Sequence, residues 1–257
     1  DSILINPPTY GMYTICATTF NVATIKVPLT NEYQLDVEHI IAQKSQQPKL
    51  VFICSPNNPT GELMAQSQIV AVLEAYKDSA LVVVDEAYIE FCADSTVTSL
   101  IEQYANLVVL RTLSKAYALA GIRCGFTLAQ ADTIAMMQKV IAPYPIPAPV
   151  EEIALQALSD GGIAKMRQQV SQLTTQKQGF IQQLTGLNQV QQIIRSDTNF
   201  VLLKVADKQK VLNAMQQHNI LIRDQSSQPT LDNCVRITIG NPVQMKAVLK
   251  VLQGCSS

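Results

Sequence analysis

Short runs of consecutive apolar residues divide the first half of the chain. Leucine, valine and isoleucine dominate residues 50–54, 81–84 and 107–110, and polar residues follow each run. Runs of this length that are apolar at every position are typical of strands buried on both faces of a parallel sheet. Between the first two runs, residues 64–77 repeat apolar side chains with the period of a helix. The alternation predicts an α/β fold with a mostly parallel sheet flanked by helices.

A proline-rich segment, residues 143–149, separates this pattern from a different one. Proline disfavours helix in the residue before it, so the segment is predicted to be extended. A long, glutamine-rich tract with helical spacing of its apolar residues follows, and it predicts a bridging helix that ends near residue 184. Beyond it, the pattern predicts two strands around a helix, at residues 199–205, 208–218 and 235–239.

The two patterns predict two domains. Residues 1–180 form a large domain that includes the bridging helix, and residues 181–257 form a small C-terminal α+β domain. With 47% hydrophobic and 15% charged residues, the chain can bury a substantial core.

Charge and cysteine usage narrow the classes of function. The formal net charge of −1 argues against a nucleic-acid partner. No apolar run approaches the ~20 residues of a membrane span, so we expect no membrane partner. The six cysteines lie far apart and form no metal-ligand spacing, which is typical of reduced thiols in a cytoplasmic protein and predicts no metal site.

Chemically active side chains follow the predicted strands. Asn58 comes after the first apolar run, Asp85 and Tyr88 after the second, and Lys115 after the third. In parallel sheets ligands bind beyond the carboxyl ends of the strands, so these side chains are expected to meet. A carboxylate, a lysine and nearby hydrogen-bond donors are what a pyridoxal 5'-phosphate site requires.

Each residue type has a defined task toward that cofactor. Asp85 is predicted to keep the ring nitrogen protonated, because the ring accepts electrons only in that form. Lys115 is predicted to bond to the cofactor aldehyde and, once freed by the substrate amine, to move protons. Tyr88 and Asn58 are predicted to donate to the phenolic oxygen.

A phosphate group needs hydroxyls and a fixed cation. Thr112 and Ser114 precede Lys115, and Arg123 follows it in an otherwise uncharged run. A guanidinium group binds phosphate through two parallel hydrogen bonds. These three residues are therefore predicted to hold the cofactor phosphate.

Three motifs occur in a familiar order: SPNNPTG at residues 55–61, DEAY at residues 85–88 and SKAYALAGIR at residues 114–123. In this order they resemble the fold-type I aminotransferases. The longer sequence motifs, DEAYIEF and the later RDQ and CVRITIG, are similar to those of the histidinol-phosphate aminotransferases within that family. The likeness runs from PTYGMY, at residues 8–13, to about residue 240.

The resemblance implies further site residues. Tyr10 matches the position whose ring stacks on the cofactor pyridine, whereas Tyr13 is interpreted as packing and Glu86 as a capping or surface acid. Arg236 matches the residue that binds the substrate anion, beside Asn58. Arg223 would add the second positive charge that a phosphate dianion favours, with an internal salt bridge as the alternative.

The resemblance also implies an activity: exchange of the amino group of L-histidinol phosphate with 2-oxoglutarate, which yields glutamate, in histidine biosynthesis. It implies a homodimer with active sites at the interface, and an N-terminal part of the large domain without counterpart here. Alternatives remain open. They are a phospho-amino-acid decarboxylase or an aromatic transaminase on the same fold, an aminotransferase-like sensing domain, and an inactive fragment.

Overall fold

A six-stranded sheet forms the first part of the molecule. The structure is a computed structural model that describes residues 1–255. The strands are arranged in the order β2-β1-β3-β4-β5-β6, all parallel except β6, which runs antiparallel to β5. Their bounds are β1 Ser2–Ile5, β2 Ala23–Lys26, β3 Leu50–Cys54, β4 Leu81–Asp85, β5 Leu107–Thr112 and β6 Gly125–Ala129. The predicted mostly parallel sheet is confirmed.

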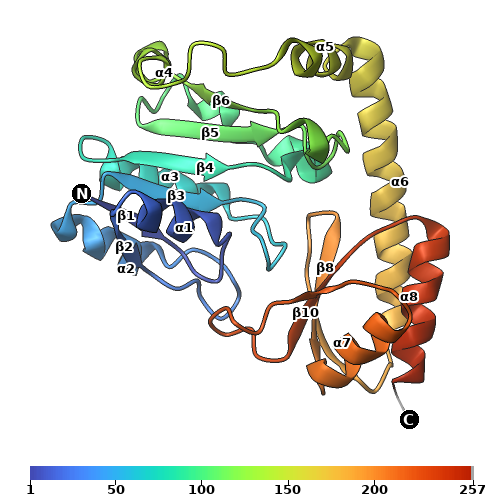
Figure 1. Ribbon diagram of the computed structural model, residues 1–257. Helices are drawn as coiled ribbons and strands as arrows, with labels where there is room; N and C mark the ends of the chain where they lie inside the picture. Colours follow the sequence, from blue (N-terminus) through green and yellow to red (C-terminus); the bar gives the residue numbers. More distant parts are fainter. Residues whose placement is uncertain (256–257) are drawn as a thin grey trace.

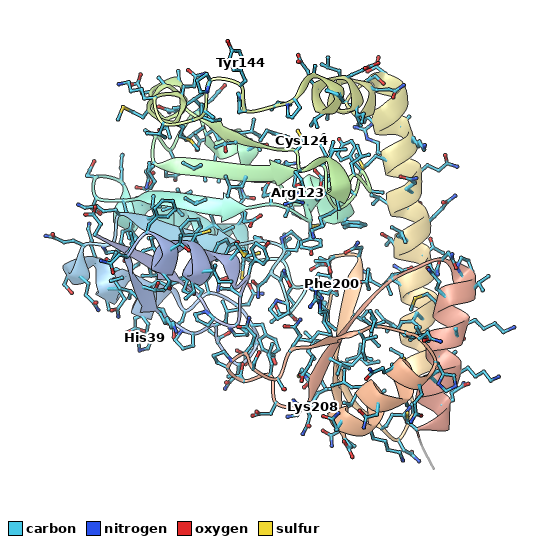
Figure 2. The ribbon with its side chains drawn as sticks, viewed as in Figure 1. His39, Arg123, Cys124, Tyr144, Phe200 and Lys208 are labelled. Carbon is cyan, nitrogen blue, oxygen red and sulfur yellow. The ribbon has the colours of Figure 1, made fainter. Side chains whose placement is uncertain are left out.

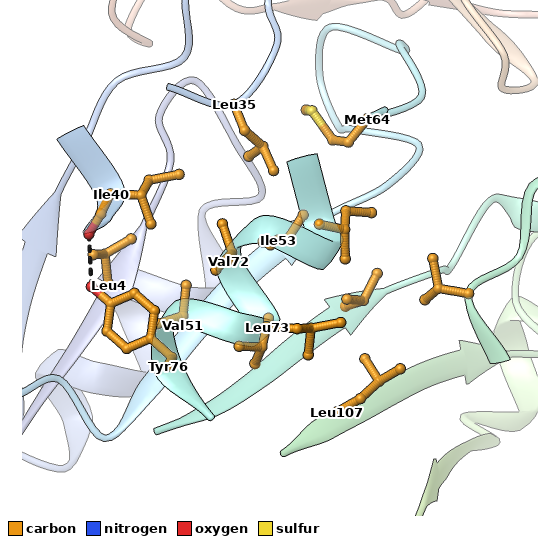
Figure 3. Packing of buried hydrophobic residues seen from close by; sticks show 14 of the residues in the cluster. Leu4, Leu35, Ile40, Val51, Ile53, Met64, Val72, Leu73, Tyr76 and Leu107 are labelled. Carbon is orange, nitrogen blue, oxygen red and sulfur yellow. Dashed lines mark hydrogen bonds between the residues drawn. The ribbon is translucent and has the colours of Figure 1, made fainter. Parts of the chain in front are cut away.

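Helices cover both faces of this sheet because successive side chains of a strand point to opposite faces. In β1, Ile3 and Ile5 pack with helix α1 (Met12–Thr19). Leu4 belongs instead to the large core on the other face, under helices α2 (Val37–Ala42) and α3 (Gln66–Tyr76). Figure 3 shows this core, in which the Tyr76 hydroxyl donates to the carbonyl oxygen of Ile40 at 2.7 Å. Both strand faces are thus buried, as their continuous apolar sequence predicts.

Short 3-10 segments connect the elements of the large sheet: η1 Gln43–Gln46, η2 Ile89–Ser95, η3 Thr98–Leu100 and η4 Ala120–Ile122. After β6 come α4 (Ala131–Gln138) and α5 (Ala148–Ala157), joined by residues 139–147. The segment predicted to be extended over residues 143–149 ends earlier, because Ala148 and Pro149 form the first turn of α5, where proline is tolerated. Helix α6 (Asp160–Leu184) then runs along one side of the molecule, from α5 to the second sheet (Figure 1). Ser159 caps α6 by accepting a hydrogen bond from the backbone N–H of Gly162.

The second sheet is smaller and antiparallel, in the order β7-β8-β10-β9. Its elements are β7 Val190–Ile194, β8 Phe200–Val205, α7 Lys208–Gln217, β9 Arg223–Asp224, β10 Cys234–Thr238 and α8 Pro242–Gly254. Helices α7 and α8 pack on it together with the end of α6. The predicted small α+β module is therefore present. The predicted domain boundary falls inside α6, where Phe180 and Leu184 already pack with this second core, and it remains a prediction.

A turn at residues 196–198 ties the two sheets together. The buried Lys177 amine of α6 donates to the carbonyl oxygens of Ser196 and Thr198, each at 2.6 Å. On the other side of the turn, the Asp197 backbone N–H donates to the Gly61 carbonyl oxygen at 2.7 Å. Gly61 has φ +91°, and a Cβ there would lie 2.6 Å from the Ser196 hydroxyl, so only glycine fits. These contacts fix the SPNNPTG loop against the small sheet.

None of the helices that the structure describes combines the length and apolar character needed to span a bilayer.

Candidate active site

A pocket of about 360 Å³ opens at the carboxyl ends of β3, β4 and β5. The SPNNPTG loop, the DEAY motif and the segment that contains Lys115 all contribute to its wall. The eight residues predicted to contact a cofactor all line it: Tyr10, Asn58, Asp85, Tyr88, Thr112, Ser114, Lys115 and Arg123. Residues from four separate segments of the sequence therefore converge on one cavity.

Asp85 ends β4 and is 9% exposed. Its Oδ2 accepts a hydrogen bond from the Tyr13 hydroxyl at 2.7 Å, and its Oδ1 accepts one from the Ala87 backbone N–H at 3.0 Å. Burial raises the pKa of Asp85, while the two hydrogen bonds and the charge of Lys115 lower it. The carboxylate is thus held at the pocket wall in a fixed orientation.

Lys115 follows β5, in a turn closed by the hydrogen bond from the Leu119 N–H to the Leu113 carbonyl oxygen. Its Nζ lies 5.2 Å from the centre of the Tyr88 ring and makes no hydrogen bond within residues 1–255. Burial lowers the pKa of Lys115, and Arg236 lowers it further. An amine of lowered pKa is more often neutral, which is the nucleophilic form.

The pocket wall also carries two hydroxyls and a guanidinium group. Thr112 Oγ1 donates to Ser114 Oγ at 2.8 Å and accepts from the Ser114 backbone N–H at 3.1 Å. Arg123 has φ +55° and donates from Nη1 to the Ala120 carbonyl oxygen at 3.0 Å, which leaves its other N–H groups available. Figure 2 shows Arg123 beside the large sheet, in the region between it and Phe200 of β8.

Arg236 of β10 extends from the small sheet to Asn58, a residue of the pocket wall. Its Nη1 donates to Asn58 Oδ1 at 2.5 Å, and its guanidinium carbon lies 4.7 Å from the centre of the Phe200 ring. Its Nε is buried and has no hydrogen-bond partner among residues 1–255. A buried N–H without a partner is costly, so this group is poised for an acceptor. Since the Asn58 oxygen is occupied, its amide nitrogen remains as a donor.

Comparison with known proteins decides the family. The model for "Aminotransferase class I and II" matches residues 1–252. The chain belongs to this family. Among its relatives, the histidinol-phosphate aminotransferase of Aeromonas hydrophila subsp. hydrophila is 51% identical over 257 residues, which cover 100% of this chain and 72% of the relative. That of Pasteurella multocida, named histidinol-phosphate aminotransferase 1, is 45% identical over 253 residues, 98% of this chain and 72% of the relative.

Solved aminotransferase structures have the same fold. The histidinol-phosphate aminotransferase of Clostridium acetobutylicum superposes with a TM-score of 0.93 at 25% identity, covering 100% of this chain and 78% of that one. The Sinorhizobium meliloti enzyme, solved with pyridoxal 5'-phosphate, has a TM-score of 0.88 at 22% identity, over 99% of this chain and 70% of that one. The predicted family and fold are confirmed, and this aminotransferase is pyridoxal-phosphate-dependent.

The pocket of this aminotransferase fits that cofactor chemically. The buried Asp85 carboxylate suits a protonated ring nitrogen, and the Lys115 amine makes no hydrogen bond with any of the 255 described residues. The hydroxyls of Thr112 and Ser114 and the guanidinium of Arg123 suit a phosphate. The donor set thus provides one group for each functional end of the cofactor.

Arg223, like Arg236, is a predicted site residue that the pocket wall does not include. On β9 it lies directly opposite Arg236 of β10, and its side chain is exposed. Within residues 1–255 it makes no ion pair, so the alternative of an internal salt bridge is wrong. Burial lowers the pKa of the half-buried Arg236, and the nearby charge of Arg223 lowers it further.

Two interpretations from the sequence need correction. Tyr13 packs as predicted, but its hydroxyl also bonds to Asp85. Glu86 is neither a cap nor a surface acid: it is 1% exposed and accepts from Arg111 Nε at 2.8 Å and from the Val97 backbone N–H at 2.7 Å. The ion pair between Glu86 and Arg111 could have been predicted from the sequence, because an arginine near the end of an apolar strand needs a buried acid as its partner.

Proposed function

We propose that this aminotransferase exchanges the amino group of L-histidinol phosphate with 2-oxoglutarate, producing imidazole-acetol phosphate and glutamate. The names and 45–51% identity of its relatives support this substrate pair. The observation that carries the proposal is a pocket that holds a buried carboxylate and a lysine amine without a hydrogen bond to residues 1–255. Asn58 on its wall also bonds to the half-buried guanidinium of Arg236.

The cofactor supplies an aldehyde that combines with amino groups and a ring that withdraws electrons from the bond to be broken. Asp85 would hold the ring nitrogen, and Tyr10 would cover one face of the ring. Tyr88 and the Asn58 amide nitrogen would donate to the phenolic oxygen. Burial raises the pKa of Tyr88 to about 12, so its hydroxyl stays protonated and able to donate.

Lys115 is the residue placed to move the proton. Its Nζ makes no competing hydrogen bond with residues 1–255, and burial lowers the pKa of Lys115, which favours the neutral amine. A base within hydrogen-bond reach of the substrate carbon can remove its proton, and the resulting ammonium can return it at a neighbouring atom. The same side chain would thus serve as base and acid.

Arg236 and Arg223 would bind the substrate anion. Histidinol phosphate carries a phosphate but no carboxylate, so a dianion must be neutralised in one half-reaction and a carboxylate in the other. The buried Nε–H of Arg236 has no partner in the part of the chain that the structure describes, and Arg223 lies opposite Arg236 on the next strand. Two guanidinium groups at paired positions of neighbouring strands suit the dianion, whereas one guanidinium group suffices for a carboxylate.

Arg223→Ala is expected to weaken histidinol phosphate roughly threefold to tenfold and glutamate much less. The effect is moderate because Arg223 is exposed and its charge is partly screened. Single-turnover spectroscopy with each amino donor measures both affinities, and the difference should shrink at high salt. Arg236→Ala should weaken both donors by about 2–5 kcal/mol, because its guanidinium is desolvated.

Arg195→Ala is the matched control, since Arg195 is an exposed arginine whose ion pair is with Asp197 at 3.5 Å. It should leave both donors unchanged. Equal losses for the two donors in Arg223→Ala would contradict the phosphate role. Faster turnover of tyrosine or phenylalanine than of histidinol phosphate would move the assignment to an aromatic transaminase.

We further propose that the chain forms a homodimer through an apolar edge. This edge comprises exposed side chains of α4, α5 and the segment between them, which follow one another beside β6 (Figure 1). They include Met136, Val140, Ile141, Tyr144, Ile146 and Leu155. Contiguous exposed apolar surface of this kind marks protein–protein contacts.

Sedimentation at micromolar concentration is expected to show a dimer that Tyr144→Asp weakens, because Tyr144 is 93% exposed on this edge. Leu221→Asp is the control, since Leu221 is 91% exposed but lies in the small module. A monomeric wild-type chain, or equal loss of dimer in both variants, would count against this interface.

A further inference from the structure

Tyr13 contacts both Asp85 and Tyr10, two residues that we propose to bind the cofactor. It is 7% exposed on α1, and its hydroxyl donates to Asp85 Oδ2 at 2.7 Å. Its ring stacks on Phe52 with centres 4.8 Å apart and planes 21° apart. The Tyr10 ring meets it edge-on, with centres 5.6 Å apart. Aromatic packing on both sides therefore aims the hydroxyl at the carboxylate.

Tyr13 differs from the other titratable side chains around Asp85 in how it contacts the carboxylate. Within residues 1–255, Tyr13 provides the only side-chain hydrogen bond to Asp85, and the other bond comes from the Ala87 backbone. The remaining titratable groups that face the carboxylate are Cys54 of β3, Tyr88 and Lys115. Each interacts with it through charge alone, so none of these three fixes its orientation.

We propose that Tyr13 is a positioning residue that holds the Asp85 carboxylate ionised and turned toward the ring nitrogen of the cofactor. The inference rests on the role of Asp85 in the proposed function and adds the group that sets its charge state. A carboxylate buried without a donor tends to take up a proton. A protonated Asp85 could not keep the ring nitrogen charged, and electron withdrawal would weaken.

The electrostatics agree with the geometry. Burial raises the pKa of Asp85, and among the influences that lower it the hydrogen bond from Tyr13 is the largest. Burial also raises the pKa of Tyr13 well above its usual value, as do the charges of Cys54 and Asp85. The Tyr13 hydroxyl therefore keeps its proton near neutral pH and remains a donor.

The first test needs no bound cofactor. Tyr13→Phe keeps the ring and removes the hydroxyl, and carbon NMR titration of labelled aspartate carboxyls in cofactor-free protein follows Asp85. Because a hydrogen bond to a charged group is lost, the pKa of Asp85 is expected to rise by roughly 1 to 2. Tyr76→Phe is the matched control: its hydroxyl is also buried and donates to the Ile40 carbonyl oxygen, away from the pocket. It should leave the pKa of Asp85 unchanged.

With cofactor bound, Tyr13→Phe should lower kcat about tenfold, following the pKa change, and move its acid limb to higher pH, with KM for the donor nearly constant. Tyr76→Phe should show neither change. The same Asp85 titration in both variants, or an unaltered pH profile of kcat in Tyr13→Phe, would overturn the inference. If the wild-type chain does not transaminate, the proposed function fails, whereas the titration still decides whether Tyr13 controls Asp85.

A second replacement guards against misfolding of Tyr13→Phe. Replacing Tyr13 by 3-fluorotyrosine preserves the ring and the hydroxyl but makes the hydroxyl a stronger donor. The pKa of Asp85 should then fall, opposite in sign to the Phe variant. An unchanged or raised pKa of Asp85 in the fluorinated protein would rule out the coupling.

Discussion

Lys115→Ala is expected to lower kcat by about 10⁴-fold or more while the protein remains folded. The loss combines the two roles proposed for Lys115, which are the bond to the cofactor aldehyde and the transfer of the proton. The stability cost should be small, because the Lys115 amine makes no hydrogen bond within residues 1–255 and its burial already disfavours the charged form.

Chemical labelling tests the assignment of Lys115 as the cofactor lysine independently of turnover. Addition of pyridoxal phosphate followed by borohydride should leave the label on the peptide that contains Lys115. Lys177 is the matched control, because burial lowers its pKa too, but its amine is engaged by two carbonyl oxygens. Label on Lys177, or on the exposed Lys139 or Lys165, would show that the lowered pKa alone does not identify the cofactor lysine.

The central strands could be predicted because they are buried on both faces. β3, β4 and β5 are apolar at nearly every position, and polar residues begin where each strand ends. β7 gave no such signal, since it is an edge strand whose glutamines Gln191 and Gln192 face solvent. β1 has only four residues, too few for a pattern to stand out at the start of the chain.

The candidate site residues could be picked out along the sequence, but the hydrogen bonds between them and their exposure could not be predicted. Asp85 ends β4 and Lys115 follows β5, and these two strands lie side by side, so sheet topology brings the residues to the same edge. The bond from Tyr13 to Asp85 joins residues 72 positions apart, through a helix packed on the sheet. The exposure of Arg223 depends on the pairing of β9 with β10. Contacts of this kind follow from tertiary packing, which a local pattern does not encode.

Asp85→Asn is expected to lower kcat by roughly 10²- to 10³-fold, the usual cost of removing one preorganised charge from an active site. Stability should not fall with it. The folded-state pKa of Asp85 lies above its unfolded value, so any stability that this group contributes is present in acid and is lost as pH rises through the folded pKa. At pH 7 the charged form therefore costs free energy, which the neutral amide avoids. An asparagine can also keep both bonds, accepting from the Ala87 N–H and donating to the Tyr13 oxygen.

Glu86→Gln provides the contrast, since the two acids are neighbours with different partners. The Glu86 carboxylate is paired with Arg111 and accepts hydrogen bonds from Thr96 and Val97, and Glu86 itself is not part of the pocket wall. Breaking a buried ion pair costs about 3–5 kcal/mol, so urea unfolding should show a large loss of stability with kcat largely retained in the folded fraction. Asp85→Asn should show the reverse pattern, with cofactor still bound by absorbance. Near-normal turnover in Asp85→Asn would remove the carboxylate from the mechanism, because the electron-withdrawing ring would then be working without the charge that Asp85 is placed to supply.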